Sequence, residues 1–150
     1  MAALKTLALA IEVATQKRDQ AGKNLVQVQR TYLSAESQMA QLKSYADETA
    51  SKWATGAQAL TSAELLRHHT QFMERLQQAI HLQAEALENE ARRVEAAKRL
   101  TLDAESRLAG LKQMLKKKQM ERSRIQARRE QRQTDEVAGM LRHRMATNGE

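Results

Sequence analysis

The sequence lacks the residues that usually interrupt or cross-link a chain. Its 150 residues include no proline, no cysteine and only five glycines. Without proline, no backbone N–H is missing from a potential helix. Without cysteine, neither a disulfide nor a thiolate metal site can form. No apolar run approaches the roughly 20 residues of a membrane span, so we expect a soluble, cytoplasmic protein.

Aromatic residues are also rare, since only Tyr32, Tyr45, Trp53 and Phe72 carry large rings. A globular core of this size would normally bury more of them. Ala, Leu, Glu, Lys, Arg and Gln dominate, which is typical of long helices and coiled coils. No run of β-branched residues alternates with polar ones, as strands would require. The composition predicts an all-α protein.

The first third of the chain carries an unbroken heptad pattern, whose positions are lettered a to g. Most of its a and d positions are apolar. A helix with one such seam wraps around a partner helix. At 1.5 Å per residue this helix would be about 80 Å long. The seam positions are Leu4, Leu7, Ile11, Ala14, Arg18, Ala21, Leu25, Val28, Tyr32, Ala35, Met39, Leu42, Ala46, Thr49 and Trp53.

The pattern stops after Trp53, which predicts a helix over about 2–53, a turn over about 54–61 and a second helix from about 62. Gly56 can adopt the left-handed conformation that ends many helices. Thr61 and Glu64 have the spacing of a capping box. The seam of the second helix is Leu66, His69, Met73, Leu76, Ile80, Gln83, Leu87, Glu90, Val94, Ala97, Thr101, Ala104, Leu108, Leu111 and Leu115.

One register aligns the two seams along their full length. If the chain folds back at the turn, an a position meets a d position wherever the two residue numbers add up to 115, as for Leu7 and Leu108. We therefore predict a long antiparallel two-helix coiled-coil hairpin over residues 1–115, monomeric when free. A coiled coil of two chains with continuous helices is the alternative, but Gly56 and the capping box argue against it.

A few seam positions are polar, which predicts a soft middle of the hairpin. We expect the charged ends of Arg18 and Glu90 to reach water along their aliphatic stems. His69 is placed opposite Ala46, and its neighbour His68 points elsewhere on the helix, so the two cannot share a metal. No acid pair, phosphate loop or nucleophile–base pair occurs. The sequence therefore predicts a protein that is not an enzyme and has no cofactor or metal.

Residues 116–150 extend beyond the seam as a basic helical tail with net charge +5, out of +7 for the whole chain. A lone helix is marginal in water, so we expect this tail to be partly disordered unless a partner orders it. Apolar residues return near its end as a small stripe at helical spacing. Nucleic-acid binding is an alternative role, although the tail lacks aromatic residues and its acidic residues are interspersed.

A second candidate surface lies beside the seam near the turn. Tyr45 and Phe72 both occupy g positions, and their numbers add up to 117, so the register brings the two rings together on one flank. Two of four aromatic residues on one exposed flank suggest a docking patch. The alternative is that these g-position side chains only widen the seam.

The tail segment 128–138, Arg-Arg-Glu-Gln-Arg-Gln-Thr-Asp-Glu-Val-Ala, resembles the closing motif of the FliJ family. The early Leu-rich heptads, a Leu-x-x-Tyr element ending at Tyr45 and a Phe-Met-x-x-Leu element starting at Phe72 resemble that family too. The resemblance implies a component of the flagellar type III export apparatus that folds like the stalk of rotary ATPases. It implies binding to the ring of the export ATPase FliI, to the export-gate protein FlhA and to export chaperones, hence a peripheral place at the inner membrane.

The resemblance also implies two sets of binding residues. The family's gate-binding surface corresponds here to Gln38, Leu42, Tyr45, Phe72, Leu76 and Ala79. The residues expected to contact the ATPase ring are Arg122, Arg128, Arg129, Arg132, Asp135 and Glu136. Thr49 and Gln83 depart from the family pattern, in which a tyrosine and a histidine occur. The stalk of a virulence type III secretion system is an alternative identity, although Asp135-Glu136 favours the flagellar one.

Overall fold

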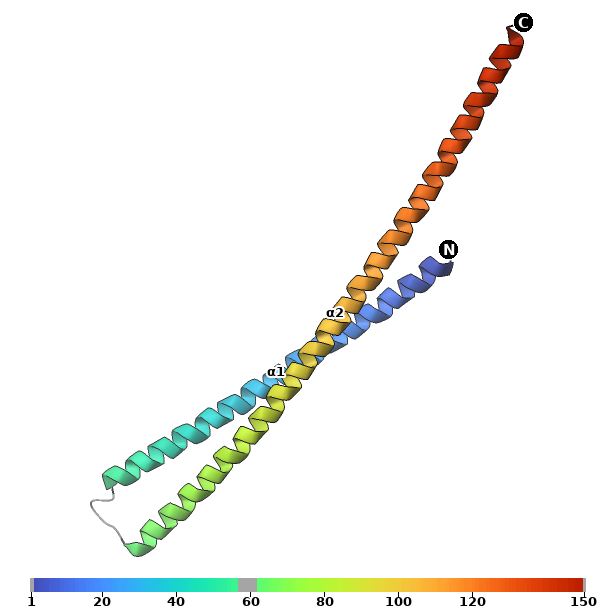
Figure 1. The fold of residues 1–150 in the computed structure, drawn as a ribbon. Coiled ribbons are helices and arrows are strands. Elements are labelled where there is room, and N and C mark those ends of the chain that lie inside the picture. The colour runs from blue at the N-terminus through green and yellow to red at the C-terminus, as the bar shows by residue number, and fades with distance from the viewer. Residues whose placement is uncertain (1, 57–61, 150) are drawn as a thin grey trace. The chain divides into compact units, whose positions relative to one another are not determined.

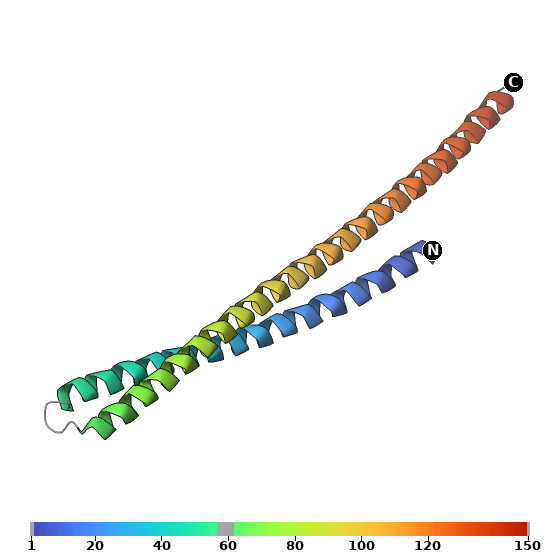
Figure 2. The ribbon, with the colours of Figure 1, turned by 60° about the horizontal axis from the view of Figure 1, so that its bottom comes forward.

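The structure, a computed structural model, describes residues 2–56 and 62–149. It consists of two helices, α1 (Ala2–Gly56) and α2 (Ala63–Asn148), and the described ranges contain no strand. The two long helices pack against each other, which confirms the predicted all-α hairpin. The chain divides into two compact units, Lys17–Ala104 and the two-segment unit Met1–Gln16 with Glu105–Glu150. Within each unit the α1 and α2 segments run antiparallel (Figure 1 and Figure 2).

The ends of the helices beside the turn differ in detail from the predicted ones. α1 continues to Gly56, and no described glycine has a positive φ, so Gly56 does not end the helix in the left-handed conformation. Thr61 lies outside the described residues. The cap that the structure shows is Ser62, whose Oγ accepts a hydrogen bond from the Leu65 N–H at 3.1 Å. Because the third helical residue is then Leu65 and not Glu64, this cap cannot close a capping box.

The predicted seam forms the core. Every seam position of α1 is buried or half-buried, and so is every seam position of α2 except Leu66, which is 48% exposed. The heptad prediction is therefore confirmed outside the first turn of α2. The most deeply buried residues are Leu7, Ala14, Met39, Ala46, Leu76, Ala97 and Leu108.

The polar seam residues follow the prediction only in part. The Arg18 side chain is 37% exposed and pairs with Asp19 at 2.9 Å, so its charged end does reach the surface. Glu90 does not behave in this way, because its side chain is only 16% exposed. One carboxylate oxygen lies 3.4 Å from Arg93, and the other, Oε2, is buried with no hydrogen-bond partner among the described residues. The stem of Glu90 is too short to carry both oxygens past the neighbouring helix.

Two other polar seam residues form hydrogen bonds across the Lys17–Ala104 unit. The Gln83 Nε2 donates to the Ala35 carbonyl at 2.8 Å, and the Thr101 hydroxyl lies 3.3 Å from the Ala21 carbonyl. Thr101 also bonds to the Ala97 carbonyl of its own helix at 2.8 Å. Polar side chains at seam positions can thus form hydrogen bonds to the backbone of the facing helix. Such bonds favour one axial register of the two helices.

Beyond Leu115, α2 continues as a helix to Asn148. Every residue from 116 to 149 is exposed except the half-buried Ala138. The positions that continue the Leu108 and Leu115 spine at seven-residue steps are Arg122, Arg129, Glu136 and His143. Charged and polar side chains at these positions cannot form an apolar seam. How well this tail is ordered without a partner stays a prediction.

Candidate protein-binding surfaces

Tyr45 of α1 and Phe72 of α2 meet on one flank of the Lys17–Ala104 unit. Their ring centroids are 6.0 Å apart and the ring planes are inclined by 81°. This is the edge-to-face arrangement that aromatic pairs prefer. Tyr45 is 53% and Phe72 is 40% exposed, so both rings retain a free face. The predicted convergence of the two aromatic residues is confirmed, and the pair forms an exposed aromatic feature.

The other residues assigned to this flank range from exposed to buried. Gln38 is exposed, Leu42 and Ala79 are half-buried, and Leu76 is only 8% exposed. Leu76 is therefore buried in the seam and offers little surface of its own. Exposed tyrosines at the centre of an interface are among the residues that dominate binding energy at protein interfaces.

Gln83 shapes one edge of this flank. Besides its bond to the Ala35 carbonyl, its Nε2 lies 3.3 Å from the Gln38 Oε1. A hollow of about 530 Å³ opens between Leu42, Tyr45 and these amides, with Gln41 at its rim. The structure thus brings Gln83 together with Gln38 and Tyr45 in a single small depression.

The Trp53 and His69 rings are stacked, an arrangement that the sequence analysis missed. Their centroids are 4.1 Å apart and their planes differ by 5°. The register places His69 level with Ala46, one heptad from Trp53. Helical side chains lean toward the N-terminus of their own helix. In an antiparallel pair, the ends of the Trp53 and His69 side chains therefore lean toward each other. A search of the sequence for two large rings on facing helices, offset by one heptad, could have predicted this stack.

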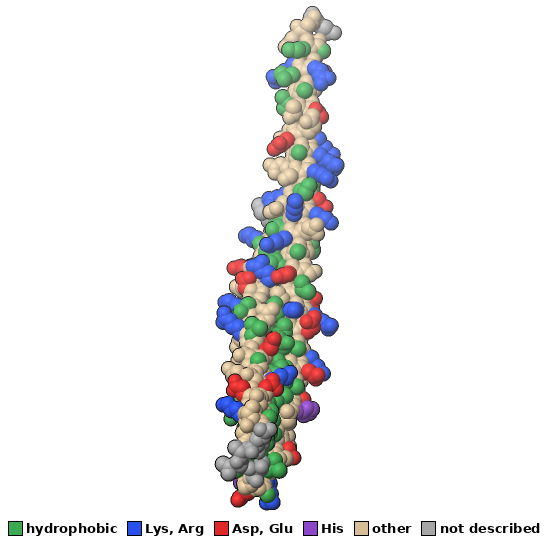
Figure 3. Space-filling view, turned by 90° about the vertical axis from the view of Figure 1, so that its left-hand side faces the viewer, with side chains coloured by type: hydrophobic (Ala, Val, Ile, Leu, Met, Phe, Trp, Pro, Cys, Tyr) green, Lys and Arg blue, Asp and Glu red, His purple; other side chains and the backbone are tan. Residues whose placement is uncertain are grey.

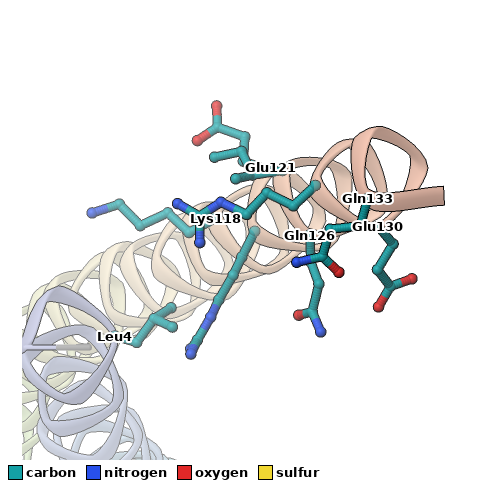
Figure 4. Close-up of a pocket in the computed structure, with 9 residues that line it drawn as sticks. Leu4, Lys118, Glu121, Gln126, Glu130 and Gln133 are labelled. Atoms are coloured by element: carbon teal, nitrogen blue, oxygen red, sulfur yellow. The ribbon is translucent and has the colours of Figure 1, made fainter. Parts of the chain in front are cut away.

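The six tail residues assigned to the ATPase ring are all exposed on α2. Arg122 and Arg129 share one face, seven residues apart, and line a hollow of about 670 Å³ that also includes Leu4 of α1. Figure 4 shows Leu4 on one side of this hollow and Lys118, Gln126 and Glu130 along α2. The hollow lies where the α1 seam runs out and its partner helix continues. Its lining combines the apolar Leu4 and Ile125 with basic residues and two glutamates, Glu121 and Glu130, so the hollow is mixed in charge.

The tail carries an apolar stripe near its end and a local hydrogen bond that involves one of the assigned residues. Val137, Leu141 and Met145 recur at intervals of four and are 57%, 53% and 76% exposed, which gives the end of α2 an apolar stripe. Asp135 accepts a hydrogen bond from the Gln131 Nε2 at 3.2 Å, so part of the acidic charge is used within the helix. On the face shown in Figure 3, basic and acidic side chains are interspersed on both helices, and blue basic groups prevail along the tail.

Residues 2–56 and 62–149 were also searched for metal sites and membrane spans. No group of three or more His, Asp or Glu side chains there could bind a metal ion. No described helix is both long and apolar enough to cross a membrane. Two exposed features stand out among the described residues, the Tyr45–Phe72 aromatic pair and the basic tail of α2.

The model of the flagellar FliJ protein family matches residues 4–147. The chain belongs to the FliJ family. Searches of curated proteins and of solved structures found no significant match. Proteins of the FliJ family have a structural or chaperone-escort role and are not enzymes. At family level, the chain is a stalk-type component of flagellar or type III export. The resemblance seen in the sequence is thereby confirmed over nearly the whole chain.

Proposed function

We propose that this FliJ-family chain is a cytoplasmic stalk that joins the export ATPase to the export gate of the flagellar type III apparatus. The observation that carries the proposal is the family match over residues 4–147. The protein binds the FliI ring and promotes its assembly, contacts FlhA, and receives export chaperones. It reaches the inner membrane only through these partners, catalyses no reaction itself and needs no cofactor.

The basic tail is the proposed contact for the ATPase ring. Its six exposed residues, Arg122, Arg128, Arg129, Arg132, Asp135 and Glu136, lie on a helical stretch without a seam. Long-range attraction between this positive helix and an acidic ring interior would speed association and would weaken as salt rises. The nearby hollow beside Leu4 offers an apolar complement to these charges.

The aromatic flank is the proposed contact for the gate. Tyr45 and Phe72 form an exposed edge-to-face pair, Gln38 is exposed beside them, and Leu76 is buried in the seam. An exposed large aromatic pair costs free energy in water, and a partner that covers it recovers that cost. The flank is therefore suited to a protein partner with an apolar or aromatic patch.

The ATPase contact is tested by ATP hydrolysis of purified FliI, with the full chain and with a chain that ends at Leu111. We expect stimulation by the full chain only, with circular dichroism showing that the shorter chain keeps its helices. Equal stimulation by both chains would move the contact from the tail to the hairpin. No stimulation by either chain, with FliI active, would contradict the ATPase part of the proposal.

The gate contact is tested by the affinity for FlhA of Tyr45→Ala and Phe72→Ala chains. We expect each substitution to weaken binding about tenfold or more, since buried aromatic residues dominate interface energetics. Leu82→Ala is the matched control, because Leu82 is 64% exposed and occupies the outward c position of its heptad. If Phe72→Ala unfolds the hairpin, the flank belongs to the core and the patch is wrongly assigned.

The virulence-system stalk and the nucleic-acid binder are the two rival functions. The match to the flagellar family model favours the flagellar system over its virulence counterpart. Nucleic-acid binding predicts affinity for duplex DNA that falls steeply as salt rises. The absence of aromatic residues from 116–150 disfavours it, since bases have no ring to stack on there.

A further inference from the structure

The methionines of the chain fall into a shielded group and an exposed group. Met39 and Met73 lie in the seam of the hairpin, where Met39 is 9% exposed and Met73 is half-buried. Met1 lies outside the described residues. The other four share an exposed position on α2, at residue 114 or beyond it. They are Met114, Met120, Met140 and Met145, which are 52%, 53%, 69% and 76% exposed.

Methionine is the only residue of this chain with a reversible sulfur chemistry, because the sequence contains no cysteine. When hydrogen peroxide oxidises a thioether, the sulfur lone pair attacks one peroxide oxygen, an S–O bond forms and the O–O bond breaks. A proton moves to the departing oxygen, which leaves as water. The sulfur loses two electrons and the peroxide gains them. Methionine sulfoxide reductases return the sulfoxide to the thioether.

Met140 lies on the face of α2 that carries three of the residues assigned to the ATPase ring. Arg122, Arg129 and Glu136 follow one another at seven-residue steps, and Met140 stands four residues beyond Glu136. Residues four apart on a helix are neighbours on its surface. An oxygen added to the Met140 sulfur would therefore change the end of this face.

Met145 is the last member of the apolar stripe that begins with Val137 and Leu141. It is the most exposed of the three, so its sulfur is open to a dissolved oxidant. A shallow hollow of about 510 Å³ lies along the first part of the stripe, beside Val137, Ala138 and Leu141. Oxidation turns an apolar side chain into a polar one. The stripe would then offer less apolar area to any protein that covers it.

We propose that Met140 and Met145 form a reversible oxidation site, which switches the last turns of α2 from an apolar surface to a polar one. Hydrogen peroxide is the oxidant. The hairpin is spared, because Met39 and Met73 are shielded in the seam. The consequence for the partner rests on the proposed ATPase contact: the oxidised tail stimulates FliI less than the reduced tail does.

The first experiment maps the reaction in the full chain. The chain is treated with hydrogen peroxide, catalase removes the excess, and peptide mass spectrometry follows each methionine. We expect Met140 and Met145 to be oxidised at least about tenfold faster than Met39, with unchanged helical circular dichroism and with reversal by methionine sulfoxide reductases. Oxidation of Met39 at the same rate would overturn the site, because exposure would then not select the sulfur atoms.

The second experiment uses two double variants of the full chain. Met140→Leu/Met145→Leu removes both sulfur atoms of the site, and Met114→Leu/Met120→Leu is the matched control, which removes two exposed sulfur atoms farther from the end of α2. Stimulation of FliI by each peroxide-treated chain is compared with that by its own untreated sample. We expect a loss of about threefold or more in the natural chain and in the control, and none in Met140→Leu/Met145→Leu. An equal loss in both variants, or no loss in the natural chain, would overturn the inference.

If the untreated natural chain does not stimulate FliI, the ATPase contact itself has failed, and retention on a phenyl resin becomes the readout. Peroxide should then shorten the retention of the natural chain and of the Met114→Leu/Met120→Leu control. The retention of Met140→Leu/Met145→Leu should stay the same. An equal shortening in all three chains, or a shortening in none, would show that the two methionines do not control the apolar end of α2.

Discussion

The stretch of α2 that ends at Leu115 and the tail that follows are one continuous helix with two different relations to the rest of the chain. Leu108 is 3% exposed in the seam, whereas Leu141 in the tail is 53% exposed. Both stretches are rich in strong helix formers, so local propensity does not separate them. The difference lies at the seven-residue spine, where Leu108 and Leu115 are followed by Arg122 and Arg129. The continuity of α2 therefore does not show where its pairing with α1 ends. The change from leucine to arginine at the seven-residue spine does.

The largest expected difference between the two stretches concerns buried leucines. Leu108→Ala should lower the free energy of unfolding by about 2–4 kcal/mol, because it leaves a cavity in the seam. Leu141→Ala should change it by less than about 0.5 kcal/mol, as is usual for surface sites. Urea denaturation followed by circular dichroism measures both. Equal effects would mean that the tail has a packing partner within the chain.

A smaller effect is expected at the polar layer of the seam. Glu90→Leu should raise the free energy of unfolding by about 1–2 kcal/mol, because it removes a buried carboxylate oxygen without a partner and adds apolar contact. Glu88→Leu is the matched control, since Glu88 is exposed and loses the same charge. Thermal unfolding of the two variants provides the comparison. A loss of stability in Glu90→Leu would show that its carboxylate has a favourable role in the folded chain.

The smallest effect concerns two glycines in helix interiors, Gly110 and Gly139. A Cβ added at either would meet no atom within 4 Å, so alanine fits at both. Gly110→Ala should raise the free energy of unfolding by about 0.5–1 kcal/mol through helix propensity. Gly139→Ala should increase helical circular dichroism without moving the unfolding midpoint. A shift of the midpoint by both variants would show that the tail unfolds together with the hairpin.

Much of the fold could be predicted from the sequence because the heptad repeat is long and regular. The period places each seam residue, and the shared register places Tyr45 beside Phe72, as the structure shows. Such periodic patterns report burial directly, since they repeat only if one side of the helix meets a partner. The aromatic flank was therefore accessible to reasoning from spacing alone.

The features that were missed depend on single side chains. Whether Ser62 or Thr61 caps α2 is a choice between adjacent hydroxyls that no period distinguishes. Glu90 and Arg18 both occupy seam positions, but only the longer arginine brings its charge to the surface. The Trp53–His69 stack depends on how far two rings lean along their helices. Side-chain length and direction decide these cases. A heptad assignment gives only the position of a residue in the repeat, so it predicts neither.

The two hydrogen bonds from Gln83 to Ala35 and from Thr101 to Ala21 have a mechanical consequence. If one helix slid along the other by a heptad, about 10 Å, seam residues would again face seam residues. Apolar burial alone would then resist such shear only weakly. The two bonds exist in a single register, so each must break before sliding begins. If the chain carries tension along its helices, the two bonds would resist slippage of α1 along α2 within the Lys17–Ala104 unit.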